Sequence, residues 1–191
     1  MRIILASQSP RRKELLKELS IRFETFHPVV DETLLPNEAP EGFALRLAHN
    51  KAHKAATELG DALYIGADTI VALDGAIFGK PRDLADATDI LSCLSGQTHS
   101  VITAYCVLDK PSGKEELKAV ETLVTFKELT DSEIEEYVDT LEPMDKAGAY
   151  AIQGKGKFMV ERFIGSYSNV VGLPTRELKE TLKNFLPAQG L

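Results

Sequence analysis

The chain has 191 residues, of which 43% are apolar and 27% charged, a composition typical of a globular domain with a substantial core. The formal net charge of −7 argues against a non-specific nucleic-acid binder, which would carry a basic surface. No apolar run approaches the ~20 residues of a membrane-spanning helix, so we expect no membrane association. The two cysteines lack the spacing of a metal or redox motif, which favours a cytoplasmic protein with reduced thiols.

The first predicted element is a short buried strand, indicated by the apolar run at residues 3–6. This run is too short for the core of a signal peptide and arginines follow it, so we expect no such peptide.

Ser9 and Pro10 then predict a helix start, with Ser9 at the N-cap. Arg11 and Arg12 would lie in the first turn, where the macrodipole disfavours each cation by roughly 0.3–1 kcal/mol. A bound phosphate would explain this placement, because arginines and helix N-terminal amides both bind phosphate. Two solvated arginines are the alternative.

The elements that follow mix strands and helices along the chain. We predict a strand at 21–26, a turn-rich loop at 28–40, a helix at 41–59, a strand at 63–73 interrupted near Gly66, a hairpin turn at Asp74-Gly75 and a helix at 83–94. We then predict an antiparallel pair of strands at 99–108 and 117–126, an acidic helix from Thr130-Asp131, a strand at 158–164, a loop at 165–174 and a closing helix from Pro174 to about residue 185. This order predicts an α/β fold with a mixed sheet, as one domain in two lobes.

Two acidic positions are candidates for a cation site. Asp68 stands in an otherwise apolar strand, where a carboxylate is costly to bury unless it is paired or binds a metal. Glu32 follows Asp31 on the loop at 28–40. Together Asp68 and Glu32 could form an oxygen-rich site for Mg²⁺ or Mn²⁺. A structural aspartate near a strand end and solvated loop carboxylates are the alternatives.

Two lysines could contribute positive charge to such a site. Lys51 lies on the predicted helix at 41–59, and Lys80 lies in a turn restricted by its neighbours Gly79 and Pro81. Gly79-Lys80 does not complete a phosphate-binding P-loop, because Asp74 replaces the upstream glycine and Pro81 replaces Ser or Thr. Surface lysines are the alternative for both positions.

The histidines give no recognisable metal motif. His49 and His53 are spaced four residues apart on a predicted helix, but Asn50 follows His49 where a zinc-protease helix has glutamate. We therefore expect no metal site at this pair. His99 stands alone at the start of a predicted strand, and we expect a structural role for it.

The segment 145–154 is rich in small residues around Tyr150 and Gln153. Small residues would let a ligand approach the backbone, and the Gln153 amide offers both a donor and an acceptor to the edge of a base. Ordinary turn chemistry is the alternative interpretation.

Taken in order, these motifs resemble one family, the Maf family of nucleoside triphosphate pyrophosphatases. The resemblance covers almost the whole chain and is carried by SQSPRR (7–12), VDE (30–32), RLAHNKA (46–52), GADT (66–69), GKP (79–81), SGQTH (95–99), DKAGAYAIQG (145–154) and VVGLP (170–174). It implies an α/β fold with a mixed twisted sheet and flanking helices, in two lobes around a substrate cleft. It also implies hydrolysis of a nucleoside triphosphate to the monophosphate and pyrophosphate with a divalent metal cation.

The resemblance also implies roles for individual residues. Asp68 looks like the general base, and Glu32 belongs with it to the metal and catalytic shell. The residues implied to bind the phosphates are Ser9, Arg12, Lys51 and Lys80, with both lysines counted as catalytic. Ser7 is implied to bind the substrate. The resemblance also allows a homodimer.

Three positions point to a subgroup within the family. Arg11, Thr69 and Gln153 are similar to the members that act on dTTP and UTP. Members that act on 7-methyl-GTP would show an aromatic residue, glutamine and an acidic residue at these positions. Two alternatives stay open: a 7-methyl-GTP pyrophosphatase, and a non-catalytic nucleotide-binding regulator of septum formation.

Overall fold

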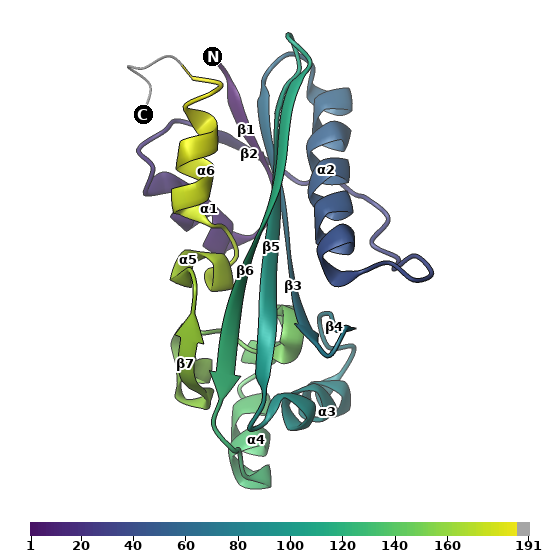
Figure 1. Cartoon of the computed structure of the whole chain (residues 1–191), viewed down its shortest axis with the longest axis vertical. Helices are drawn as coiled ribbons and strands as arrows, with labels where there is room; N and C mark the ends of the chain where they lie inside the picture. Colours follow the sequence, from purple (N-terminus) through teal and green to yellow (C-terminus); the bar gives the residue numbers. More distant parts are fainter. Residues whose placement is uncertain (187–191) are drawn as a thin grey trace. The chain divides into compact units, whose positions relative to one another are not determined.

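The computed structural model describes residues 1–186, which form a mixed α/β fold (Figure 1). The strands are β1 (Ile3–Ala6), β2 (Glu24–Phe26), β3 (Leu63–Leu73), β4 (Ala76–Phe78), β5 (Thr98–Asp109), β6 (Lys114–Phe126) and β7 (Val160–Ile164). The α-helices are α1 (Pro10–Lys17), α2 (Pro40–Leu59), α3 (Leu84–Leu94), α4 (Asp131–Val138), α5 (Tyr167–Val171) and α6 (Thr175–Leu182). Short 3₁₀ helices cover Glu142–Asp145, Ala147–Ala149 and Gly154–Met159. Among residues 1–186, no helix is both long and apolar enough to cross a membrane.

The strands form one mixed sheet in the order β2-β1-β3-β5-β6-β7, and β4 pairs with β3 outside this path. β1 runs parallel to both β2 and β3, whereas β4 and β7 run antiparallel to β3 and β6. β5 and β6 are neighbours joined by a turn too short for a parallel crossover, so they form the expected antiparallel pair. The predicted mixed α/β class is confirmed.

The chain divides into two compact units. Among the described residues, the first comprises 1–68, 103–120 and 172–186, and the second comprises 69–102 and 121–171. Both units take residues from the long strands β3, β5 and β6. The single-domain assignment and the cleft between lobes stay predictions.

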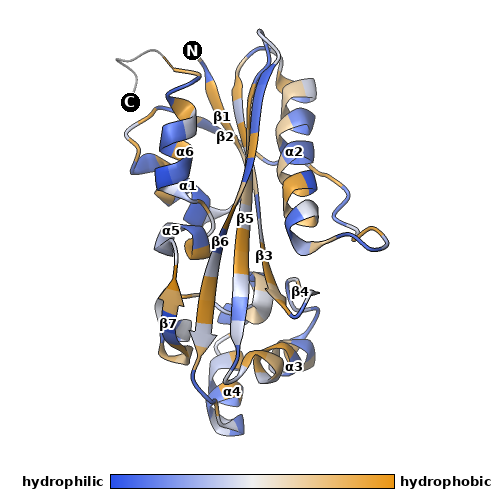
Figure 2. Cartoon of the chain, viewed as in Figure 1, coloured by the Kyte–Doolittle hydropathy of each residue, from blue (hydrophilic) through white to orange (hydrophobic). Residues whose placement is uncertain are grey.

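The first unit encloses its part of the sheet between helices. In Figure 1, α2 lies along one face of this part, and α1 and α6 lie along the other. Figure 2 shows apolar and hydrophilic residues alternating along α2, as expected of a helix with one buried side. Tyr105 of β5 and Thr181 of α6 are joined by a buried hydroxyl–hydroxyl hydrogen bond of 2.9 Å.

Gly66 does not interrupt β3, contrary to our expectation, because the strand is continuous from Leu63 to Leu73. Its role is to let α2 come close. A Cβ atom at this position would lie 2.3 Å from the Ala48 carbonyl oxygen and 2.7 Å from the Ala52 nitrogen. The absence of a side chain therefore sets the contact between β3 and α2.

The second unit has its own core, which includes Phe126, Tyr150 and the helices α3 and α4. Thr130 caps α4 through a capping box with Glu133, which confirms the predicted helix start. The small residues near Tyr150 pack against protein: a Cβ at Gly148 would lie 2.7 Å from a methyl carbon of Val71. We expected these small residues to leave space for a ligand. At Gly148 that space is instead filled by the packing of the backbone on β3.

Several predicted boundaries were wrong. β2 covers Glu24–Phe26, because the chain at Ile21 is buried without pairing in the sheet. β7 begins at Val160, because a 3₁₀ helix occupies the residues before it. The predicted loop at 165–174 contains the helix α5. The hairpin turn at Asp74-Gly75 is confirmed by positive φ angles of 50° and 82°, the conformation of a type I′ turn.

Candidate functional site

The helix α1 begins where the sequence predicts, after Ser9. Pro10 is the first helical residue, and the Ser9 hydroxyl accepts a hydrogen bond of 3.4 Å from the backbone nitrogen of Arg12. Arg11 and Arg12 therefore lie in the first turn. This end combines two guanidinium groups with the positive end of the helix dipole, which suits an anionic ligand.

Arg12 also holds this turn against the rest of the first unit. Its Nε donates to the Gly172 carbonyl and its Nη1 to the Ala67 carbonyl, both at 2.9 Å. Nη1 also donates to the Ser7 hydroxyl at 3.4 Å. Burial lowers the pKa of Arg12, although the charge of Asp68 acts in the opposite direction. Because Ala67 directly precedes Asp68, these bonds fix the start of α1 beside the acidic position on β3.

Asp68 is the buried carboxylate at the centre of the candidate site. Its Oδ1 accepts a hydrogen bond of 2.6 Å from Lys51 Nζ, and the side chains of both residues are only 12% exposed. The same Nζ lies 2.7 Å from Glu32 Oε1. One ammonium group therefore bridges two carboxylates that the sequence places 36 residues apart.

The loop that carries Glu32 is attached to α2 through Arg46. Its guanidinium makes two bonds with the Glu38 carboxylate, of 2.6 and 2.7 Å, and donates to the Thr33 carbonyl at 2.9 Å. The Asp31 carboxylate accepts from the Thr33 nitrogen at 2.9 Å, and hydrogen bonds from Thr33 lower the pKa of Asp31. Asp31 thus closes a local turn, while Glu32 reaches Lys51.

Sequence reasoning missed Arg46 and Glu38. Arg46 lies within the motif RLAHNKA (46–52), but the motif alone assigns it no role. An acidic residue shortly before a helix and an arginine within its first two turns were the available signal.

Three candidate residues belong to the second unit. Thr69 follows Asp68 on β3, Lys80 is exposed after β4, and Gln153 is exposed at the start of the 3₁₀ helix Gly154–Met159. The loop at Lys80 is held by a hydrogen bond of 3.0 Å from the Gly148 nitrogen to the Gly79 carbonyl. A common site for these residues and the first unit stays a prediction.

The candidate cation ligands are hard oxygen donors. Glu32 and Asp68 share Lys51 Nζ, so their bonded oxygens are no further apart than the sum of the two distances to it. Mg²⁺ is commonly held by one or two carboxylates, with water and substrate phosphate filling its other positions. The two carboxylates therefore fit a cation that is shared with a phosphate ligand.

Comparison with known proteins identifies the family of the chain. The family model described as "Maf-like protein" matches residues 2–185. A protein of Geobacter metallireducens named dTTP/UTP pyrophosphatase is 53% identical over 184 residues, covering 96% of each chain. Proteins with the same name from Geotalea uraniireducens and Clostridioides difficile are 52% and 45% identical, covering 96% and 97% of this chain and 94% and 95% of their own. The chain belongs to the Maf family.

Proposed function

We propose that this protein hydrolyses dTTP and UTP between the α- and β-phosphates, releasing the nucleoside monophosphate and pyrophosphate. The observation that carries the proposal is the Lys51 bridge between Asp68 and Glu32. It occurs in a chain about half identical to relatives named for this activity. Free nucleotides are a cytoplasmic pool, so the proposal places the enzyme in the cytoplasm.

Binding a triphosphate requires local positive charge in this acidic protein. The substrate carries about four negative charges, and the chain has a net charge of −7. Arg11, Arg12 and Lys51 supply cations in the first unit, and we assign Lys80 of the second unit to the same task. The Ser7 hydroxyl accepts from Arg12 Nη1 and the Ser9 hydroxyl accepts from the Arg12 backbone nitrogen, and each can also donate its own proton to a phosphate oxygen.

Asp68 is the proposed general base. Its carboxylate accepts a proton from the attacking water, whose oxygen forms the new bond to the α-phosphorus. The bond from that phosphorus to the bridging oxygen breaks, and pyrophosphate leaves with this oxygen. Lys51 holds Asp68 in place through their hydrogen bond. The positively charged side chains of Arg11, Arg12 and Lys80 stabilise the charge that develops on the phosphate oxygens.

A divalent cation is part of the proposal, with Glu32 and Asp68 as its protein ligands. When bound, the cation would neutralise phosphate oxygens and make water more acidic. Mg²⁺ and Mn²⁺ suit the oxygen donors best.

Base selection is assigned to Arg11, Thr69 and Gln153. Uracil and thymine share a carbonyl oxygen and an N–H on one edge, and the Gln153 amide can pair with both at once. The exposed position of Gln153 in the second unit leaves its side chain accessible to a ligand.

The test is pyrophosphate release from dTTP, UTP, CTP, dATP, GTP and 7-methyl-GTP, with Mg²⁺, with Mn²⁺ and with chelator. We expect metal-dependent release from dTTP and UTP. Release from 7-methyl-GTP alone would keep the reaction and overturn the assigned substrate. Nucleotide binding without any release would overturn the reaction and favour a regulator.

A further inference from the structure

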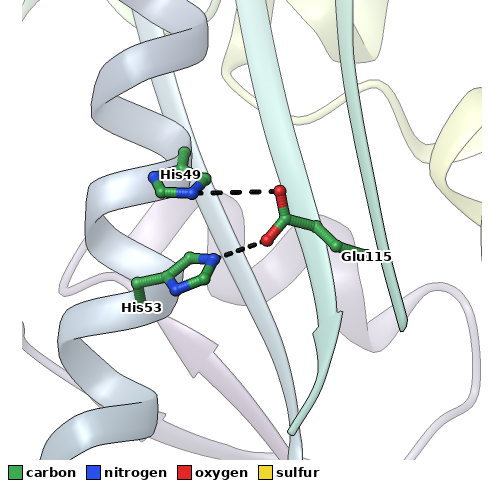
Figure 3. A group of neighbouring side chains, drawn as sticks. All are labelled: His49, His53 and Glu115. Carbon is green, nitrogen blue, oxygen red and sulfur yellow. Dashed lines mark hydrogen bonds and ion pairs between the residues drawn. The ribbon is translucent and has the colours of Figure 1, made fainter. Parts of the chain in front are cut away.

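Two histidines and a glutamate form a compact cluster that the proposed reaction does not use (Figure 3). His49 and His53 lie on α2, and Glu115 lies on β6; all three belong to the first unit. His53 Nε2 is 2.5 Å from one oxygen of Glu115, and His49 Nε2 is 3.9 Å from the other. The two imidazole rings stack with their centroids 4.0 Å apart, so they present nitrogen atoms to the same carboxylate.

This cluster lies on a different side of α2 from the candidate active site. Ala48 and Ala52 meet β3 at Gly66. Successive residues of a helix are about 100° apart around its axis. His49 and His53 therefore point to one flank of the alanine contact, and Lys51 points to the other. One helix serves two separate groups of side chains.

The donor set of this cluster differs from that of the active site. Imidazole nitrogen with one carboxylate is a ligand set that zinc enzymes use, and it favours Zn²⁺, Ni²⁺ or Cu²⁺ over Mg²⁺. Four residues is the spacing at which two helical histidines lie on one face. The sequence predicts no metal site at this pair because Asn50 stands where a zinc-protease helix has its general base. The structure adds a carboxylate of a different kind, a potential ligand, from a strand 62 residues further along the chain.

We propose that His49, His53 and Glu115 bind a transition-metal ion of the zinc class, separate from the catalytic cation. The three ligand atoms lie within 4.8 Å of one another. Bonds of about 2.0–2.1 Å to a tetrahedral ion would bring them to about 3.3 Å. The side chains are 40%, 44% and 28% exposed, so they have room to rotate inward and water can fill the fourth position. The ion would tie α2 to the β5–β6 hairpin.

The test is calorimetric titration of the metal-free protein with Zn²⁺, without nucleotide and with excess Mg²⁺ to occupy the catalytic carboxylates. The histidine ring nitrogens are followed by NMR in the same titration. His53→Gln and Glu115→Gln each remove one ligand, and His27→Gln removes an exposed histidine elsewhere. We expect the unmodified protein and His27→Gln to bind one Zn²⁺, with shifts of the His49 and His53 rings. Each ligand variant should bind it at least about tenfold more weakly.

Equal Zn²⁺ affinity in all four proteins, or no binding to the unmodified protein at micromolar Zn²⁺, would overturn the proposal. Urea unfolding with and without Zn²⁺ is a second readout, because an ion that binds only the folded chain raises the midpoint. The two ligand variants lie on different elements, so a folding defect in one leaves the other informative. Pyrophosphate release in Mg²⁺ should be unchanged in both. None of these zinc measurements depends on the proposed nucleotide hydrolysis.

Discussion

Lys51 Nζ lies 2.6 Å from Asp68 Oδ1, with both side chains almost removed from solvent. Lys51 comes from the middle of α2 and Asp68 from the middle of β3, and the helix reaches the strand only because Gly66 has no side chain. The same ammonium also binds Glu32, on a loop before the helix. Three separate segments thus meet at a single charged group.

Replacing Asp68 by asparagine removes the proposed base and keeps the shape of the side chain. We expect turnover of dTTP to fall at least about 100-fold, because an amide cannot accept the proton. Nucleotide affinity should be retained. Steady-state pyrophosphate release and calorimetric binding measure the two quantities. Asp61→Asn, a change at an exposed position just before β3, is the matched control. Turnover close to that of the control would remove Asp68 from the mechanism.

Arg46→Ala should weaken catalysis although it replaces none of the residues assigned to bind the phosphates or the metal. It removes both bonds to Glu38 and the bond to Thr33, so the loop that carries Glu32 loses its attachment to α2. Misplacement of a group near the reacting atoms by about 1 Å can cost about 100-fold; we expect a decrease in kcat of about 10- to 100-fold.

Arg2→Ala is the control for Arg46→Ala, because Arg2 makes a similar two-bond pair with Glu24 away from this loop. Glu38→Gln should reproduce the effect on kcat, since it weakens the same contact from the other side. If both Arg46→Ala and Glu38→Gln match Arg2→Ala in kcat, the loop does not need this attachment.

Gly66→Ala should destabilise the first unit. The added methyl group would overlap the backbone of α2 at Ala48, and such overpacking typically costs about 1–3 kcal/mol or more. Gly42→Ala is the matched control within α2, because the nearest atom to its added methyl is 4.0 Å away. A glycine inside a helix is less stable than alanine by roughly 0.5–1 kcal/mol, so the control should stabilise. The urea unfolding midpoints of the two variants are compared with that of the unmodified protein. If Gly66→Ala and Gly42→Ala shift the midpoint in the same direction, this account is wrong.

Stability should fall on mild acidification because of His99. This residue is 1% exposed, its Nε2 lies 2.8 Å from the Tyr150 hydroxyl, and burial lowers its pKa to about 4. The unfolded chain binds a proton below about pH 6.5 and the folded chain only below about 4. The free energy of unfolding therefore decreases as the pH drops through this window, by roughly 3 kcal/mol in total.

Urea unfolding of the unmodified protein and of His99→Gln, between pH 7.5 and 4.5, isolates this contribution. Glutamine does not titrate, so the variant should be less stable at neutral pH but lose less stability on acidification. Parallel curves for the two proteins would show that His99 is not the group responsible.

Gln153→Glu tests base selection. A carboxylate keeps the acceptor but loses the donor of the amide, so the variant can no longer pair with both groups on the pyrimidine edge. We expect kcat/KM for dTTP and UTP to fall by about tenfold or more, the scale of one lost hydrogen bond to a substrate. The activation by Mg²⁺ should be unchanged. An unaltered preference among the six nucleotides would remove Gln153 from base selection.

Local chemistry was enough to predict many elements and the chemistry-bearing residues. The N-cap of α1 at Ser9, the start of α4 at Thr130 and the hairpin turn at Asp74-Gly75 depend on interactions within a few residues, and the sequence predicts all three. Asp68 stood out for a similar reason, because a carboxylate inside an apolar strand needs a partner.

The identity of each partner required the tertiary structure. Nothing local links Lys51 to Glu32 or His53 to Glu115, because these pairs are brought together by the packing of α2 on the sheet and by the path of its preceding loop. Gly66 shows the same limit: its sequence suggested a break, whereas its function is the close approach of a helix. Sequence determined which residues carry charge and where the chain turns; the packing of distant segments decided which charges meet, since contact energies act through space and not along the chain.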